Sequence, residues 1–123
     1  MTTKTVTQLK PTLICVHICA YILVQAMADQ ELEFEWDEAK ARLNLEKHGV
    51  SFLTAAAIFL NERLERVDDR EDYGEVHWIA LGRVDIEVYR VVYTWRNENL
   101  VRIVSAQRAG KNEQEIYYRE VFS

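Results

Sequence analysis

The pattern of hydrophobic and polar residues predicts two helices in the first half of the chain. The first runs from Trp36 to His48, with Asp37 as a suitable N-cap and Gly49 as a suitable C′ residue. The apolar face of this helix, which we expect to pack on the core, carries Trp36, Ala39 and Leu43. A polar, basic face beside it carries Lys40, Asn44 and Lys47.

The second predicted helix is more hydrophobic than the first, and Ser51 is expected to cap it. Its apolar residues follow the i, i+3, i+4, i+7, i+8 spacing of a helix surface that faces a core: Phe52, Ala55, Ala56, Phe59 and Leu60. We therefore expect this whole face to be buried.

Beyond the second helix the pattern changes to that of strands. Four short stretches rich in Val, Ile, Leu and aromatic residues are expected to be strands: Leu64–Val67, Val76–Leu81, Ile86–Trp95 and Leu100–Ser105. The short gaps between them favour antiparallel hairpins. A closing helix is expected over Lys111–Val121. This order predicts an α+β fold with two N-terminal helices, a four-stranded antiparallel sheet and a C-terminal helix.

Residues 1–28 differ in composition from the rest, because they contain no acidic residue, two lysines and a long apolar run. Three interpretations stay open: an over-called start with Met27 as the true first residue, which we rank first, a signal peptide, and an additional cytosolic helix. A membrane-spanning helix needs about 20 apolar residues, more than this run supplies. We divide the chain into an N-terminal extension, 1–28, and one domain, 29–123, for which no membrane association is expected.

The charge of the chain is unevenly distributed. The formal net charge of −5 argues against a protein that coats nucleic acid by charge alone. Residues 29–75 hold 14 acidic and 6 basic residues, or −8, whereas residues 76–123 hold 6 acidic and 7 basic residues, or +1. An anionic ligand is therefore better tolerated in the second half, and the first half offers a surface for a basic partner.

Arginine in the predicted strands is the main candidate for chemistry. Four arginines lie within or at the ends of the last two strands: Arg90, Arg96, Arg102 and Arg108. Guanidinium groups suit phosphate because they stay charged and donate two hydrogen bonds in one plane. With Tyr89, Tyr93 and Trp95 nearby, such a sheet suits single-stranded RNA, through phosphate contacts and base stacking. For any single arginine, an ion pair on a solvated face is the more common case, and for most of the aromatic residues a place in the core or the strand is the default.

Two histidines are further candidates. His77 lies two residues from Glu75 and is suited to act as a general acid or base. His48 is better explained as a charge at the C-terminus of the first helix than as a catalyst.

No cofactor and no metal are expected. Glycine-rich phosphate loops and the common metal and nucleophile motifs are absent. The spacing Cys15-x-His17-x-Cys19 would place both cysteines on one face of a helix, but it lacks a fourth ligand, so we expect small buried hydrophobic residues.

Several blocks between Phe34 and Tyr117 resemble the BrnT family of toxins, in matching order and spacing. They are Phe34–Lys40, Asn44, Lys47–Phe52, Trp78–Gly82, Val92–Arg96 and Arg102–Ala106. The resemblance implies a RelE-like fold and a cytoplasmic toxin of a type II toxin–antitoxin system that arrests growth by cleaving RNA. It also implies neutralisation by a BrnA-type antitoxin, through which alone the toxin would reach operator DNA.

Related folds cleave RNA without metal. A base takes the ribose 2′-OH proton, the 2′-oxygen attacks the adjacent phosphate, and arginine or lysine stabilises the additional negative charge. On this resemblance, Arg96 and Arg102 are expected to bind and stabilise the phosphate and His77 to act as acid or base. Substrate-binding residues are expected at Lys40, Lys47, His48, Gln107 and Arg108.

Two positions depart from the family pattern. His77 stands where the family's Glu-x-Arg has arginine, and Gln107 stands where its Ser-Ala-Arg has arginine. Arg108 replaces that charge only if the strand ends or bulges there, since adjacent strand residues point to opposite faces. A second hypothesis therefore stays open, in which the chain is a catalytically weak RelE-like binding module that serves as antitoxin partner and co-repressor.

Overall fold

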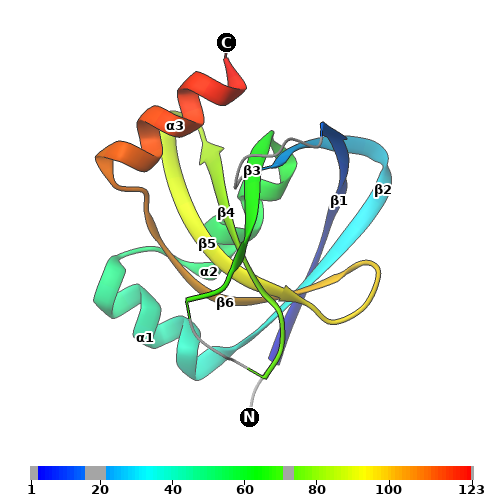
Figure 1. Cartoon of the computed structure of the whole chain (residues 1–123). Coiled ribbons are helices and arrows are strands. Elements are labelled where there is room, and N and C mark those ends of the chain that lie inside the picture. Colours follow the sequence, from blue (N-terminus) through cyan, green and yellow to red (C-terminus); the bar gives the residue numbers. More distant parts are fainter. Residues whose placement is uncertain (1–2, 16–21, 71–73, 123) are drawn as a thin grey trace.

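The computed structural model describes residues 3–15, 22–70 and 74–122, which form a mixed sheet and three α-helices (Figure 1). The strands are β1 (Thr3–Cys15), β2 (Ile22–Asp37), β3 (Arg63–Asp68), β4 (His77–Val84), β5 (Glu87–Trp95) and β6 (Leu100–Arg108). The helices are α1 (Glu38–His48), α2 (Phe52–Ala57), the 3₁₀ helix η1 (Ile58–Leu60) and α3 (Lys111–Val121). The α+β class is thus confirmed, and each of the four predicted strands is present.

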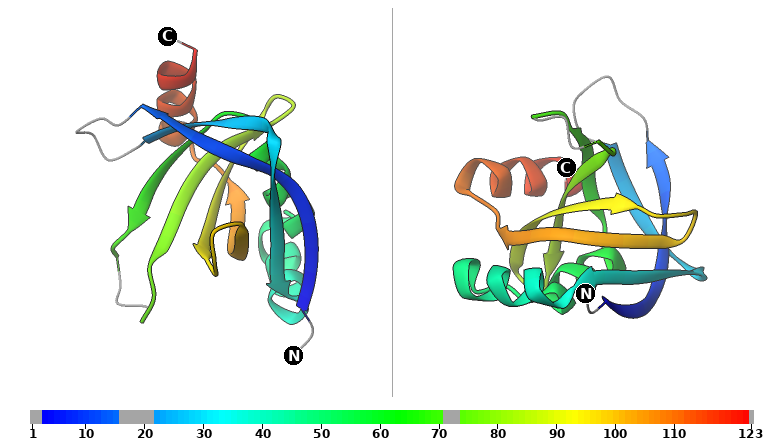
Figure 2. Two further views of the ribbon diagram at one scale, coloured as in Figure 1. Left: turned by 90° about the vertical axis from the view of Figure 1, so that its right-hand side faces the viewer. Right: turned by 90° about the horizontal axis from the view of Figure 1, so that it is seen from below.

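The predicted four-stranded antiparallel sheet is wrong, because the described residues form a six-stranded mixed sheet. Consecutive strands from β1 to β6 pair antiparallel, and β2 also pairs in parallel with β6. Residues 22–24 of β2 lie beside β3, whereas residues 33–35 lie beside β6, so this long strand reaches both edges of the β3–β6 sheet (Figure 2). The two helices α1 and α2 consequently follow two strands and are not N-terminal.

The cause of this difference lies in the stretch before α1. Leu32, Phe34 and Trp36 are buried and alternate with exposed or half-buried glutamates, which is the period of a strand with one face on a core. Trp36 therefore belongs to β2, and the helix begins only after Asp37.

The predicted caps of α1 are confirmed, but its predicted start at Trp36 and its predicted inner face are wrong. Asp37 accepts a hydrogen bond from the Ala39 backbone N–H at 2.9 Å, and Gly49 ends the helix at φ +70°. Leu43, however, is 64% exposed, and the buried residue of this helix is Asn44. The Asn44 side chain donates to the carbonyls of Val50 and Ala106 and accepts from the Ala106 N–H, at 2.8–3.1 Å. Hydrogen bonding to β6, rather than an apolar stripe, therefore sets the inner face of α1.

The second helix is capped by Ser51, as predicted, since its hydroxyl accepts from the Thr54 N–H at 3.1 Å. Four of its five predicted core residues are buried: Phe52, Ala55, Ala56 and Phe59. The prediction for Leu60 is wrong, because this side chain is 43% exposed. The chain tightens into η1 at residue 58, which changes the turn per residue and gives Ile58 the core position instead.

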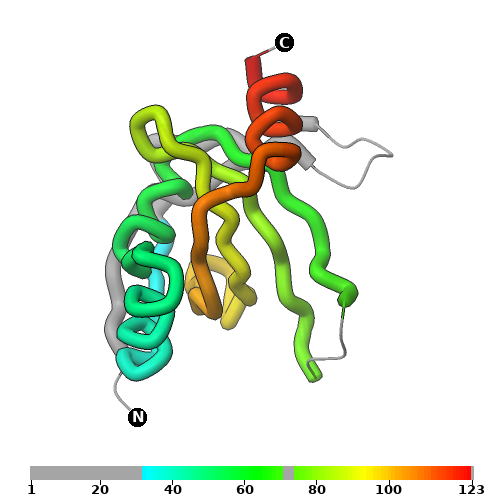
Figure 3. Tube along the Cα trace, turned by 90° about the vertical axis from the view of Figure 1, so that its left-hand side faces the viewer, coloured from blue at the N-terminus to red at the C-terminus, as the bar shows by residue number. Residues whose placement is uncertain are grey.

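The sheet buries two clusters on opposite faces. The larger lies under α1 and α2 and includes Phe34, Phe59, Val91, Tyr93 and Ile103. The smaller lies under α3: Leu64, Leu81, Val88, Ala109 and Tyr117. Figure 3 shows α1 and α2 along one side of the strands and α3 near one end of the other side. We call the side that carries the smaller cluster the α3 face.

The N-terminal stretch is extended where the structure describes it. Cys15 ends β1, while His17 and Cys19 lie outside the described residues, so the expectation that both cysteines are small buried hydrophobic residues stays a prediction. The interpretation of this stretch as a helix is wrong for residues 3–15 and 22–28, which are strand. None of the helices in the described ranges is long and apolar enough to cross a membrane. The division of the chain at residue 28 stays a prediction.

Candidate functional site

The three residues predicted to be catalytic meet in one chain of ion pairs. Arg102 Nη1 lies 2.6 Å from Glu35 Oε2, and Arg96 Nε lies 3.8 Å from the same oxygen. Arg96 Nη1 is 3.9 Å from Glu75 Oε1, and Glu75 Oε2 is 2.9 Å from His77 Nε2. We call these five residues, Glu35, Glu75, His77, Arg96 and Arg102, the Arg–Glu–His network.

Strand pairing explains why residues so distant in sequence meet. Glu35 of β2 and Arg102 of β6 are partners in the parallel ladder, and Arg96 directly follows β5. The Thr94 hydroxyl of β5 donates to the Val76 carbonyl at 2.7 Å, which holds the start of β4 beside the end of β5. Strand alternation places Arg102 on the α3 face, because its neighbours Val101 and Ile103 lie in the core under α1 and α2.

Sequence reasoning missed Glu35, because its partner Arg102 is set by the unpredicted β2–β6 pairing. The available signal was the alternation of residues 32–36, which marks Glu35 as facing away from Phe34 and Trp36.

The cations of this network are already paired in the unliganded protein. Two arginines face two glutamates, so their formal charges balance. Arg102 makes the short contact and is 23% exposed, whereas Arg96 makes two long contacts and is 49% exposed. Exposed ion pairs at such distances contribute little, about 0–1 kcal/mol. An incoming anion therefore displaces the carboxylate partners of Arg96 most easily, whereas the pair of Arg102 with Glu35 is held more firmly.

The predicted substrate-binding residues on α1 lie elsewhere. They line a shallow pocket of about 210 Å³ formed by Lys40, Leu43, Asn44, Lys47, His48, Val104 and Ser105. This pocket contains none of the network residues. The sequence-predicted site is thus divided between the network and a separate basic surface of α1.

Arg108 does not replace the arginine charge that the family has at position 107. β6 extends through Arg108, and residues 105–108 pair one to one with residues 92–89 of β5 without a bulge. Gln107 and Arg108 therefore point to opposite faces. Arg108 is exposed and pairs with Glu87, with 3.1 Å between Nε and Oε1, whereas Gln107 lines a pocket with Arg90.

The aromatic residues predicted to stack on bases are largely engaged in the core. Tyr93 is fully buried, packs edge-on against Phe59 and donates a hydrogen bond to Glu65. Tyr89 and Trp95 are partly buried and pack against the same core. Tyr93 therefore takes the core position that is the default for a strand aromatic, and it is not available for base stacking.

A buried arginine lies next to this core. Arg63 is fully buried, pairs with Glu65 at 2.9 Å, and stacks over the Phe59 ring with its Cζ 4.2 Å from the centroid. Burial lowers the pKa of Arg63, and the neighbouring carboxylate of Glu65 opposes this effect. Since an arginine starts far above neutral pH, we treat it as a charged structural residue.

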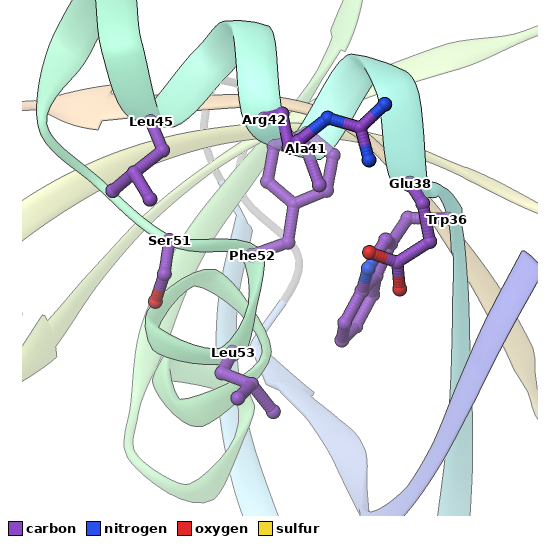
Figure 4. A pocket seen from close by; sticks show the side chains of 8 residues that line it. All are labelled: Trp36, Glu38, Ala41, Arg42, Leu45, Ser51, Phe52 and Leu53. Carbon is purple, nitrogen blue, oxygen red and sulfur yellow. The ribbon is translucent and has the colours of Figure 1, made fainter.

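An apolar pocket of about 170 Å³ lies between the first two helices (Figure 4). Its lining combines residues of α1, α2 and the end of β2: Trp36, Glu38, Ala41, Arg42, Leu45, Ser51, Phe52 and Leu53. Leu45 and Leu53 are about half exposed at its rim. None of the predicted site residues lines it.

Metal ligands do not gather in the described part of the chain. Within residues 3–15, 22–70 and 74–122, no three His, Cys, Asp or Glu side chains lie close enough together to hold a metal ion.

The comparisons with known proteins identify the class. Residues 36–113, more than half of the chain, match the family model described as ribonuclease toxin, BrnT, of type II toxin–antitoxin system. The matched residues thus define a ribonuclease toxin of a type II toxin–antitoxin system. The chain belongs to the BrnT family, as its sequence blocks predicted, and membership implies an antitoxin partner.

The chain is also similar to a solved structure, the 1.1 Å crystal structure of the Brucella abortus ribonuclease toxin, BrnT. The two are 22% identical, with a TM-score of 0.48, and the similarity covers 62% of this chain and 94% of that chain. A comparison with curated proteins finds no match.

Proposed function

We propose that this chain is a metal-independent endoribonuclease toxin that cleaves RNA at the Arg–Glu–His network and is neutralised by a BrnA-type antitoxin. One observation carries the proposal: His77, Arg96 and Arg102, from three separate parts of the sheet, join in a single set of contacts. Family membership supports the ribonuclease class.

The first step is the exchange of a carboxylate for the RNA phosphate. Glu75 is 43% exposed, and its contact with Arg96 is long, at 3.9 Å. The Glu75 side chain can therefore turn away from Arg96 at little cost when a phosphate approaches. Its departure also releases His77 Nε2, which it holds at 2.9 Å. Arg96 and Arg102 then face the phosphate oxygens.

The chemical step needs a base and charge stabilisation. His77 Nε2 takes the proton of the ribose 2′-OH, and the 2′-oxygen forms a bond to the adjacent phosphorus. The phosphorus–O5′ bond breaks and O5′ takes a proton from the imidazolium of His77, directly or through water, which yields a 2′,3′-cyclic phosphate and a 5′-OH and returns His77 to its neutral form. The two guanidinium groups stabilise the additional negative charge of the transition state. The positive charge for this step comes from arginine, so no metal is required.

Substitution of Arg96 tests the proposal. Arg96→Ala should lower the cleavage rate of a labelled RNA, measured in the presence of EDTA, by about 10²–10³-fold, the range for loss of one transition-state donor. Growth arrest on induction should weaken in parallel. Arg119→Gln is the matched control, because it removes an arginine that is 67% exposed on α3. Equal cleavage by the Arg96 variant and the parent, or no cleavage by the parent, would contradict the proposal.

A second candidate function is a catalytically weak module that binds the antitoxin and acts as co-repressor. It is favoured by the short Arg102–Glu35 pair, which occupies one cation, and by the uncharged Gln107 on the α3 face. The variant Gln107→Arg distinguishes the two candidates. New toxicity in this variant, from an inactive parent, favours the module, whereas a parent that is already toxic favours the nuclease.

The antitoxin is expected to be basic where it contacts the first half of the domain, since residues 29–75 carry −8. In this proposal the toxin reaches operator DNA only through the antitoxin. A neighbouring reading frame that encodes a small protein with a ribbon-helix-helix part would support this pairing, and its absence would count against it.

A further inference from the structure

A small polar pocket lies on the α3 face, apart from the residues of the Arg–Glu–His network. It has a volume of about 80 Å³ and is lined by Arg70, Arg90, Val92, Ser105 and Gln107. Among the described residues that line it there is no carboxylate, and their polar side chains are two guanidinium groups, one hydroxyl and one amide. All four can donate hydrogen bonds, which suits an anion.

Strand register places Arg90 beside Gln107, the position where the family has arginine and this chain has an uncharged side chain. Arg90 and Gln107 are direct partners in the antiparallel β5–β6 ladder, and Val92 and Ser105 are the next pair on the same face. Directly opposed side chains have Cβ atoms about 5 Å apart. Arg90 is therefore placed to act on any ligand that contacts the Gln107 amide.

The Arg90 guanidinium has an unfilled hydrogen-bonding position. Its Nε is buried without a hydrogen-bond partner among the described residues, and the nearest carboxylate oxygen, Glu113 Oε2, lies 3.5 Å away. That separation is longer than a normal N–H···O hydrogen bond of about 2.9 Å. A buried donor without a partner is costly, so a bound oxygen at this point would be favourable.

Arg70 contributes a second guanidinium in a fixed orientation. Its Nε and Nη2 lie 2.7 and 2.8 Å from the two carboxylate oxygens of Asp68, which holds the group by a bidentate contact. This contact presents the Arg70 guanidinium in a set orientation at the pocket.

We propose that this pocket binds a phosphate group of the RNA, and that Arg90 supplies the positive charge that Gln107 does not. The proposal rests on the proposed ribonuclease function and names a further substrate contact for it. The volume suits a single phosphoryl group rather than a base, because one water occupies about 30 Å³.

The phosphate in this pocket flanks the one that is cleaved. Gln107 lies five residues along β6 from Arg102, a distance of roughly 16 Å at 3.3 Å per residue. One phosphate cannot contact both residues. Arg90 therefore contributes to RNA binding and leaves the chemical step to the network.

The test measures binding of a ligand that cannot be cleaved. A short fluorescent oligodeoxythymidine has phosphates but no 2′-OH, and its affinity is followed by anisotropy over a range of salt concentrations, with inorganic phosphate as competitor. Arg90→Gln should weaken binding by about tenfold or more, since hydrogen bonds to charged groups are strong. It should also reduce the slope of log K against log salt by about 0.7, the value for one phosphate contact on a single strand.

Two further variants make the test independent of folding defects in Arg90→Gln. Glu113→Gln removes the carboxylate nearest Arg90 but keeps the side-chain oxygen that accepts from the Gly110 N–H. It should tighten binding several-fold. Arg119→Gln removes one positive charge, as Arg90→Gln does, but from an exposed site, and it should change the affinity by less than twofold. Arg90→Gln and Glu113→Gln variants that bind like Arg119→Gln would overturn the proposal.

Parallel RNA cleavage separates this proposal from the proposed function. If the parent cleaves RNA, Arg90→Gln should raise KM about tenfold with little change in kcat, and an unchanged KM would refute the pocket while the nuclease stands. If the parent does not cleave RNA but its binding of the oligonucleotide depends on Arg90, the pocket stands and the nuclease function fails.

Discussion

Asn44 offers the sharpest test of how α1 is held on the sheet. Its side chain makes three hydrogen bonds to backbone groups of Val50 and Ala106, at 2.8–3.1 Å, and the residue is 7% exposed. Asn44→Ala removes all three, and each contributes about 1 kcal/mol net. We therefore expect the free energy of unfolding to fall by about 3 kcal/mol, measured by urea denaturation with an unchanged m-value.

The neighbouring Leu43 is the matched control. It is 64% exposed, so Leu43→Ala should cost no more than about 0.5 kcal/mol, the usual range for a surface substitution. A loss for Leu43→Ala equal to or larger than that for Asn44→Ala would refute the reasoning. It would mean that α1 packs through its apolar residues, as the periodicity alone predicts.

Two further substitutions test the packing of the core, both by chemical denaturation. Arg63→Met leaves Glu65 as a buried charge and should cost about 3–5 kcal/mol. The double variant Arg63→Met/Glu65→Gln removes that charge but keeps an acceptor for the Tyr93 hydroxyl, so it should recover most of the loss, and a double variant no more stable than the single one would contradict this account. Gly82→Ala places a Cβ only 2.7 Å from the Ile58 Cβ and should cost about 1–3 kcal/mol. An equal cost in an Ile58→Gly background, which removes that Cβ, would show that this contact is not the cause.

Much of the local structure was predictable because its signals are local. The caps at Asp37, Gly49 and Ser51 depend on one side chain or one φ angle and on a few neighbouring residues. The bounds of α3 agree with the predicted Lys111–Val121 for the same reason. The family could also be recognised, since its blocks are short stretches of consecutive residues.

The inner face of α1 was not predictable from its own sequence. Its few apolar residues give a weak periodicity, and the buried position goes to an asparagine whose partners lie on another strand. The candidate site shows the same limit. His77, Arg96 and Arg102 were recognisable as residue types suited to the chemistry, but Glu35, which joins the two arginines, was not.

The sequence by itself therefore determined the helix caps, the bounds of α3, the presence of β3 to β6, the residue types available for phosphate chemistry and the family. Only the tertiary structure decided that β2 pairs in parallel with β6, that Gln107 faces Arg90, and that Arg108 points away from both. The physical reason is that a helix cap is settled within one turn of chain. The partner and register of a strand depend on hydrogen bonds between segments far apart in sequence, and a shift of one residue reverses the face of every side chain.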